Sequence, residues 1–251
     1  GVAGAAVATV LGYVVSTIIA LIQLFLTKQK VKPVFKNCVE PQMIKLIFSY
    51  GLPSFVMNAL GAFTVNFANM FLVRYSDTAV AFFGAYFKVQ QLIFMTVNGL
   101  IQGCLPIMRF NYRAKEYARL KQTNKSGTII ATVMMTVGML LVLIFPKEIL
   151  FLFSASEEMC AFGVPAMRIM SLGFVFSGFS AMIATYEQAT DSIMPGVVIQ
   201  LLRQGVLLIP VIWLLNSCIH MNGIWIAFPI TEFVTFIVAV VFLLSAVNCC
   251  I

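Results

Sequence analysis

Long stretches without a charged residue dominate this chain. Seven of them are separated by segments that carry the charges: residues 1–27, 46–73, 89–108, 126–146, 169–186, 204–231 and 233–251. A helix needs about 20 apolar residues to cross the roughly 30 Å of hydrocarbon in a bilayer. The stretches lack the strict alternation of membrane-barrel strands. The pattern therefore predicts seven transmembrane helices, near residues 3–27, 46–73, 80–108, 127–146, 159–185, 193–216 and 222–247.

Composition supports a membrane environment for most of these 251 residues. The chain is 61% apolar and 10% charged, with a mean hydropathy of +0.99. Soluble domains are about 45–50% apolar and about 25% charged. These values exclude a disordered chain, a coiled coil, a secreted disulfide scaffold and most soluble enzymes. They favour an all-α polytopic protein of the cell membrane.

The net charge of +7 follows from membrane topology rather than from a nucleic-acid partner. If successive helices alternate in direction, residues 28–45, 109–125 and 186–192 lie on one side and hold eleven of the 16 basic residues. The opposite loops hold only Arg74 and Lys147. Cytoplasmic loops collect Lys and Arg. We therefore expect residue 1 to lie outside the cell and the C-terminus to lie in the cytoplasm.

The order of segments suggests part of a larger transporter. The sequence begins within an apolar run, which a long basic segment follows. Transporters are commonly built from repeated halves. We predict that residues 1–27 form the last helix of a missing upstream lobe, that 28–45 are a cytoplasmic inter-lobe linker, and that 46–251 form a six-helix lobe. A seven-helix receptor or scaffold remains an alternative.

Charged residues within the predicted helices are candidates for function. They are Lys88, Arg168, Arg203 and Glu232, which sum to a charge of +2. A charge at mid-membrane costs at least about 2.5–3.5 kcal/mol and commonly marks a substrate or ion pathway. A snorkelling side chain or a static interhelical pair is the alternative for each of them.

Amides add two polar helix faces. In the second predicted helix Asn58 and Asn66 share a face, and in the third Gln91, Asn98 and Gln102 do so at spacings of 7 and 4. Such faces line a cavity or bond neighbouring helices. The predicted pathway residues are Asn58, Asn66, Lys88, Gln91, Asn98, Gln102, Arg168, Arg203, Gln204 and Glu232.

Prolines within the predicted helices are candidate hinges, because proline removes a helical hydrogen bond and kinks the helix. They are Pro53, Pro106, Pro210 and Pro229.

Residues that would indicate an enzyme are missing from the sequence pattern. The only histidine, His220, has no partner for a triad or a metal site, and no glycine-rich phosphate loop is present. We expect no enzyme activity, no metal site and no cofactor. Energy for transport would come from an ion gradient or from another protein.

Four motifs resemble a known family. They are GLPSF (51–55), NGLIQGCLPIMRFNYRAK (98–115), EQATDSIMPGVVIQLLRQGVLLIP (187–210) and GIWIAFPITE (223–232). Together they resemble the C-terminal lobe of multidrug and toxic compound extrusion (MATE) transporters, preceded by the last helix of the N-terminal lobe.

The resemblance implies a twelve-helix antiporter that exchanges H⁺ or Na⁺ for bulky amphipathic cations. The expected partners are a small organic cation, the lipid bilayer and the missing N-terminal lobe, without nucleic acid. Some family members carry acidic cation ligands on the helices that correspond to the second and fifth predicted helices here. In this sequence the second helix has no acidic residue, and the fifth has Arg168 instead. We therefore expect the coupling ion to bind in the missing lobe. A flippase for lipid-linked precursors or oligosaccharides, from the same superfamily, is the leading alternative.

Overall fold

The computed structural model describes the backbone of residues 2–26, 41–190 and 193–249, with side chains left aside mainly within 46–58 and 245–249. The chain divides into two compact units, Gly1–Leu52 and Pro53–Ile251. The second unit, which we call the lobe, contains most of the helices. Most of the predicted linker 28–45 lies outside the described residues, while a helix already begins at Pro41.

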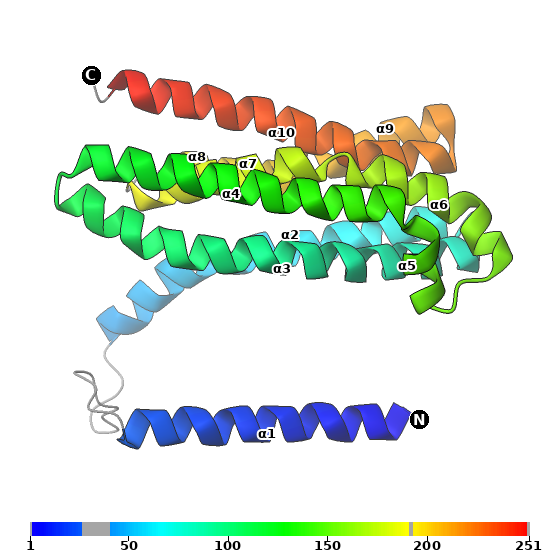
Figure 1. The fold of residues 1–251 in the computed structure, drawn as a ribbon, viewed down its shortest axis with the longest axis horizontal. Coiled ribbons are helices and arrows are strands. Elements are labelled where there is room, and N and C mark those ends of the chain that lie inside the picture. The colour runs from blue at the N-terminus through cyan, green and yellow to red at the C-terminus, as the bar shows by residue number, and fades with distance from the viewer. Residues whose placement is uncertain (1, 27–40, 191–192, 250–251) are drawn as a thin grey trace. The chain divides into compact units, whose positions relative to one another are not determined.

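All regular structure in the described residues is helical (Figure 1). The elements are α1 (Val2–Leu26), α2 (Pro41–Leu72), α3 (Asp77–Arg113), α4 (Tyr117–Ile144), α5 (Pro146–Leu152), α6 (Glu157–Ser171), α7 (Phe174–Ala189), α8 (Ile193–Leu201), the π-helical turn η1 (Leu202–Val206), α9 (Leu208–Ile219) and α10 (Met221–Cys249).

The predicted fold class is confirmed. Within the described residues, six helical segments are long and apolar enough to cross a membrane, and Ala59–Leu72 of α2 is a shorter apolar helix. The helices extend beyond the uncharged stretches: α3 continues to Arg113 and α4 starts at Tyr117. Most of the predicted loop 109–125 is therefore helical. Lys and Arg are good helix formers, so a charge ends the apolar span without ending the helix.

Two helices predicted to be continuous are interrupted. The predicted helix 159–185 is split at Leu172 and Gly173 into α6 and α7. The predicted helix 193–216 consists of α8, η1 and α9. The break at Leu172 and Gly173 was missed because the apolar pattern runs through it without a charge or a proline. The turn η1 does contain a charge, Arg203, but that charge was interpreted as a pathway residue of a continuous helix. Both interruptions lie beside the candidate site described below.

Helix α7 is the buried centre of the lobe. It packs against α3, α4, α8 and α10, and Ser180 to Glu187 are all buried. Small residues let neighbouring helices approach closely, which is how membrane helices gain packing where the hydrophobic effect is weak.

An aromatic cluster joins α3 to α10. The ring centroids of Phe82 and Trp225 are 5.2 Å apart, and those of Phe83 and Phe228 are 5.8 Å apart. Phe82, Phe83 and Trp225 are almost fully buried. Edge-to-face and tilted pairs of this kind stabilise beyond their buried area. The cluster holds α3 and α10 together where both line a cavity.

Candidate functional site

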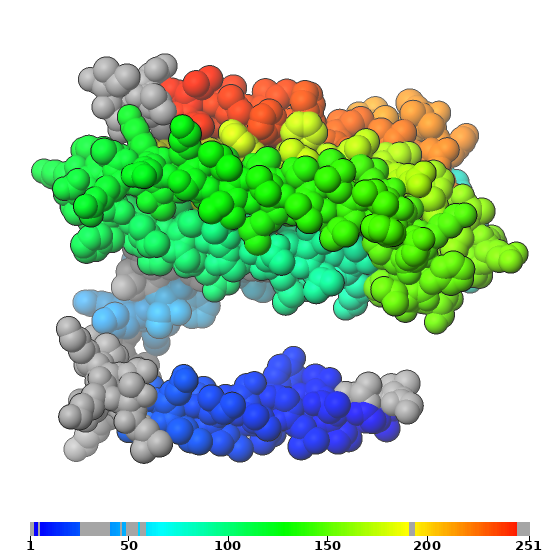
Figure 2. Space-filling model, in the orientation of Figure 1, coloured from blue at the N-terminus to red at the C-terminus, as the bar shows by residue number. Residues whose placement is uncertain are grey.

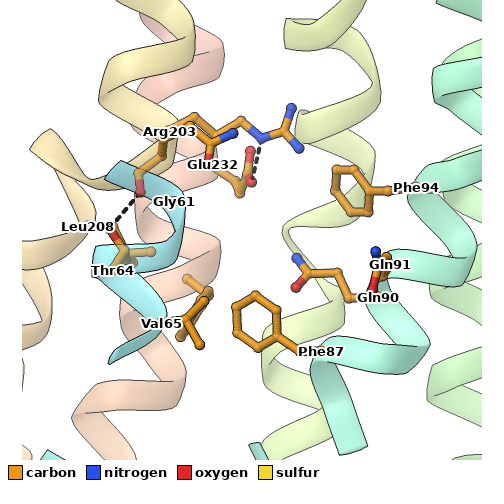
Figure 3. Close-up of a pocket in the computed structure, with 12 residues that line it drawn as sticks. Gly61, Thr64, Val65, Phe87, Gln90, Gln91, Phe94, Arg203, Leu208 and Glu232 are labelled. Carbon is orange, nitrogen blue, oxygen red and sulfur yellow. Dashed lines mark hydrogen bonds and ion pairs between the residues drawn. The ribbon is translucent and has the colours of Figure 1, made fainter. Parts of the chain in front are cut away.

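A cavity of about 450 Å³ lies within the lobe, between α2, α3, the η1–α9 segment and α10. We call it the ion-pair cavity. Its walls combine glutamines and aromatic rings on α3 with a charged pair from η1 and α10 (Figure 3). The lining residues are Gly61, Thr64, Val65, Phe87, Gln90, Gln91, Phe94, Arg203, Gln204, Leu208, Phe228 and Glu232.

Arg203 and Glu232 form an ion pair in this cavity. Arg203 Nε donates to Glu232 Oε1 at 3.2 Å, and the two side chains are 18% and 15% exposed. The Arg203 Cζ atom also lies 4.8 Å from the centroid of the Phe94 ring, within range of a cation–π interaction. Glu232 Oε2 is buried and has no hydrogen-bond partner among the described residues. The two charges thus neutralise each other, while Oε2 of Glu232 has no hydrogen bond to a described residue.

The π-helical turn brings Arg203 and Gln204 to the cavity. Thr64 Oγ1 on α2 lies 2.7 Å from the carbonyl oxygen of Gln204 and 2.9 Å from that of Leu60. The hydroxyl thereby supplies a donor where the chain departs from regular α-helix. A Cβ at Gly205 would meet Thr64 Oγ1 and would lie 3.0 Å from Leu60 Cγ. A residue without a side chain therefore permits this close contact between η1 and α2.

The break between α6 and α7 lies against Glu232. A Cβ at Gly173 would lie 3.2 Å from Glu232 Cγ and 3.3 Å from Pro229 Cα. The backbone at the break therefore packs directly on the α10 turn that carries the carboxylate. Because both helix interruptions contact this charged pair or carry it, the site occupies the least regular part of the lobe.

Four of the predicted pathway residues meet in the ion-pair cavity: Gln91, Arg203, Gln204 and Glu232. The other described candidates lie elsewhere. Lys88 is exposed and lines a different cavity beside Ser154 and Ser156. Arg168 is exposed, and its Nε donates to the carbonyl oxygen of Leu143 at 3.2 Å.

The remaining amides whose side chains are described do not line the cavity. Asn98 and Gln102 are exposed further along α3. Asn66 is exposed on α2 and donates to the carbonyl oxygen of Ala62 at 3.1 Å. The side chains of Asn58 and Pro53 lie outside the described residues.

Among the candidate hinges, Pro106 lies within α3 and Pro229 within α10. Pro210 is in the first turn of α9, directly after η1. Their hinge role stays a prediction.

Several cavity residues escaped the sequence-based selection. Phe87, Gln90 and Phe94 were not chosen, although with Gln91 they recur at i, i+3, i+4 and i+7 and so share a helix face. Thr64 was recognisable only as a polar residue of an apolar helix. A search for faces mixing amides and aromatics would have found the α3 wall.

The positive charge predicted inside the bilayer does not gather at this site. Among the described lining residues the charged ones are Arg203 and Glu232, so their charges sum to zero. Lys88 and Arg168, which made the predicted sum positive, both lie outside it. Among the described residues, no group of three or more His, Cys, Asp or Glu side chains could hold a metal ion.

Several spans, interrupted helices and a charged pair inside the bundle define a multi-pass helical membrane protein of the transporter type. The model of the MatE family matches residues 53–214. The chain belongs to this family, which confirms the resemblance carried by the four motifs.

Curated relatives are multidrug export proteins. The chain is 26% identical over 233 residues to the multidrug export protein MepA of Staphylococcus aureus, covering 92% of this chain and 51% of MepA. It is 28% identical over 206 residues to MepA of Staphylococcus haemolyticus, covering 82% and 45%. The chain thus spans about half the length of the curated relatives it matches.

Solved structures share the fold. An outward-facing multidrug resistance MATE family transporter of the MOP superfamily matches with a TM-score of 0.85 at 20% identity, over 99% of this chain and 57% of that one. The MATE multidrug transporter DinF-BH, solved in complex with a ligand, matches with a TM-score of 0.81 at 29% identity, over 96% and 55%. A MOP superfamily transporter from Pyrococcus furiosus, whose reversed binding-pocket polarity suggests a different function, matches with a TM-score of 0.83 at 19% identity, over 95% and 55%.

Proposed function

We propose that this chain is the C-terminal lobe, with one preceding helix, of an H⁺- or Na⁺-coupled antiporter that exports amphipathic organic cations. The family, the multidrug export function of the MepA proteins and the likeness to the multidrug transporter DinF-BH support this proposal. The protein then acts as a transporter rather than an enzyme and requires no cofactor beyond the coupling ion.

The observation that carries the proposal is the compensated ion pair in a cavity with aromatic walls. Phe87 and Phe94 offer apolar surface and ring faces that attract cations. Glu232 offers an acceptor oxygen that Arg203 does not use. A cavity of about 450 Å³ is within the usual range for sites that bind small molecules. An amphipathic cation would place its ring system between the phenylalanines and its charge near this oxygen.

The remaining elements of the proposal concern the rest of the protein. The coupling ion binds in an upstream lobe, since Glu232 is the only acid among the described lining residues of this cavity and its unpaired oxygen is assigned to the substrate cation. The N-terminal end of this chain lies outside the cell and its C-terminus in the cytoplasm, as the basic loops favour.

A flippase for lipid-linked anionic precursors is the second candidate. Arg203 bonds Glu232 through Nε, and no described residue accepts a hydrogen bond from its terminal Nη atoms. Free guanidinium donors suit a phosphate or pyrophosphate head. The adjacent carboxylate would repel such a head, which ranks this candidate second.

Reconstitution of the protein at its full natural length tests both candidates. In proteoliposomes, an imposed proton or sodium gradient should drive accumulation or export of a fluorescent organic cation. Arg203→Ala and Glu232→Gln should each lower the initial rate several-fold while expression and membrane insertion persist. Lys147→Gln, an exposed charge on α5, is the matched control and should transport normally.

Transport that ignores both gradients would overturn the antiport mechanism. Gradient-independent movement of a fluorescent lipid pyrophosphate, combined with no cation transport, would favour the flippase. Unchanged transport rates in both Arg203→Ala and Glu232→Gln would show that the ion pair takes no part in transport.

A further inference from the structure

Another cavity of the lobe, of about 440 Å³, lies between α4, α7 and α10. We call it the lysine groove. It is separate from the ion-pair cavity, with which it shares no lining residue. Figure 2 shows α4 in green and α10 in red at the surface on one face of the lobe. The lining residues are Lys121, Asn124, Lys125, Thr128, Ile129, Phe179, Ile183, Tyr186 and Leu243.

The groove is basic at one end and apolar along the rest. Lys121 and Lys125 are one helical turn apart on α4, so both ammonium groups project from the same face. Both side chains are exposed, and no carboxylate of the described residues lies within ion-pair distance of either. Two like charges without a counterion favour an anionic ligand over an empty groove.

The apolar part of the groove is made by two other helices. Phe179 and Ile183 come from consecutive turns of α7, and Leu243 comes from α10. Together with Ile129 on α4 they form a surface suited to a hydrocarbon chain. A soluble anion such as phosphate would use the lysines and leave this surface unused.

Two polar atoms between the lysines and the apolar surface have no partner. Asn124 is 9% exposed, and its Oδ1 atom is buried without a hydrogen-bond partner among the described residues. Thr128 Oγ1, one turn further along α4, is buried and unpartnered in the same way. Buried polar atoms are normally hydrogen-bonded. An amide oxygen requires a donor, so the ligand should carry a hydroxyl or an amine as well as its anion.

We propose that the lysine groove binds an anionic phospholipid with a hydroxylated head, of the phosphatidylglycerol type. Its phosphate lies between Lys121 and Lys125, a hydroxyl of its head donates to Asn124 Oδ1, and Thr128 donates to a phosphate or ester oxygen. One acyl chain follows Phe179, Ile183 and Leu243. The lysines belong to the basic segment that favours the cytoplasmic side, where anionic lipids attract juxtamembrane lysines. The assignment does not depend on which substrate is transported.

Lipid titration of the full-length protein tests the charge requirement. In detergent solution, native mass spectrometry should show more bound phosphatidylglycerol than phosphatidylcholine with identical acyl chains. The double variant Lys121→Gln/Lys125→Gln should bind phosphatidylglycerol at least about tenfold more weakly. The control Arg113→Gln/Lys115→Gln loses the same charge from exposed neighbours outside the groove, and should bind it like the unchanged protein.

A second variant tests the hydroxyl requirement. Asn124→Leu should retain affinity for phosphatidic acid, which has no head hydroxyl beyond its phosphate, and should lose any preference for phosphatidylglycerol over it. Melting in lipid-free detergent shows whether each variant is folded, and Asn124→Ala, which also removes the acceptor oxygen, replaces Asn124→Leu if the latter is not.

Three outcomes would overturn the assignment. Equal binding of phosphatidylglycerol and phosphatidylcholine would show that the groove does not select an anionic head group. Equal loss in the test and control double variants would reduce the effect to general surface charge. Complete displacement of the lipid by millimolar glycerol 3-phosphate would make the site one for a soluble anion.

Discussion

Two cavities of nearly equal volume in one lobe differ in the charges of the residues that line them. The ion-pair cavity, about 450 Å³, holds opposite charges that neutralise each other, whereas the lysine groove, about 440 Å³, holds two charges of the same sign. Arg203 and Glu232 lie near the middle of the spans Met194–Ile219 and Met221–Leu244. Lys121 lies close to the start of the span Tyr117–Ile144.

Depth in the membrane explains the contrast. A charge at mid-span has no water to stabilise it, so the protein must provide its counterion. A lysine near the end of a span reaches solvent or lipid headgroups, so its counterion can come from outside the chain. The charged residues of the deep site therefore have a counterion within the chain, whereas those of the peripheral site have none among the described residues.

The largest predicted effect comes from leaving one deep charge alone. Arg203→Met removes the counterion of Glu232, and unfolding of the full-length protein should become easier by about 3 kcal/mol. The double variant Arg203→Met/Glu232→Met removes both charges and should recover most of that loss. Melting in detergent measures both variants. Glu232→Met completes the cycle: if the double variant loses as much stability as the two single variants added together, the charges are not coupled.

The equivalent change at the lysine groove provides the contrast. Lys121→Gln/Lys125→Gln should leave the melting temperature in lipid-free detergent nearly unchanged, because these charges have no counterion to lose. A loss as large as that of Arg203→Met would mean that the groove also compensates its charge internally.

A somewhat smaller loss of folding stability should follow from adding a methyl group at Gly205 in η1. The methyl group of Gly205→Ala would press on Thr64 and Leu60, and overpacking of this kind typically costs about 1–3 kcal/mol. Gly99→Ala on α3 is the control, because no atom lies within 4 Å of a Cβ at Gly99. It should be neutral or slightly stabilising, since alanine favours helix over glycine. Equal melting temperatures for the two variants would contradict the close contact.

Much of the fold could be read from the sequence, because hydrocarbon imposes a simple rule on it. Uncharged runs identified each of the six candidate spans found among the described residues, since a bilayer excludes unpaired charges. The same rule misplaced helix ends such as Arg113 and Tyr117, because it reports where hydrocarbon ends rather than where the helix does.

The interruptions were not readable in this way. The break at Gly173 and the turn at Gly205 depend on atoms from α10 and α2, far away in sequence. No local pattern distinguishes these glycines from Gly99, whose surroundings are open. Contacts between helices, rather than propensity within them, decide where the backbone departs from regular helix.

The site was half predictable for a related reason. Arg203 and Glu232 stood out because an embedded charge is rare, although their pairing depends on how η1 approaches α10. Lys88 stood out equally, yet it is exposed and lines another cavity. Sequence identifies which residues are costly in lipid, but the packing determines which of them meet.

A modest loss of folding stability is expected from removing the hydrogen bond that connects α2 to η1. Thr64→Val removes the hydroxyl that reaches the Gln204 carbonyl oxygen and leaves that acceptor unpaired, which costs roughly 1 kcal/mol. The control Thr96→Val removes an exposed hydroxyl that bonds only within α3, to the carbonyl oxygen of Ile93. Thermal melting should show a loss for Thr64→Val and little change for Thr96→Val. Similar losses in both would show that the bond between helices contributes nothing specific.

The smallest predicted loss of stability in the ion-pair cavity concerns the Phe94 ring beside Arg203. Phe94→Leu keeps an apolar side chain but removes the ring face that lies 4.8 Å from the guanidinium carbon, and such contacts contribute about 0.5–1 kcal/mol. Phe110→Leu, at a side chain that is 74% exposed, is the control. A double-mutant cycle of Phe94→Leu with Arg203→Met isolates the pair, because it subtracts the packing that each residue makes with other neighbours. A coupling energy of zero would mean that Glu232 alone compensates the arginine.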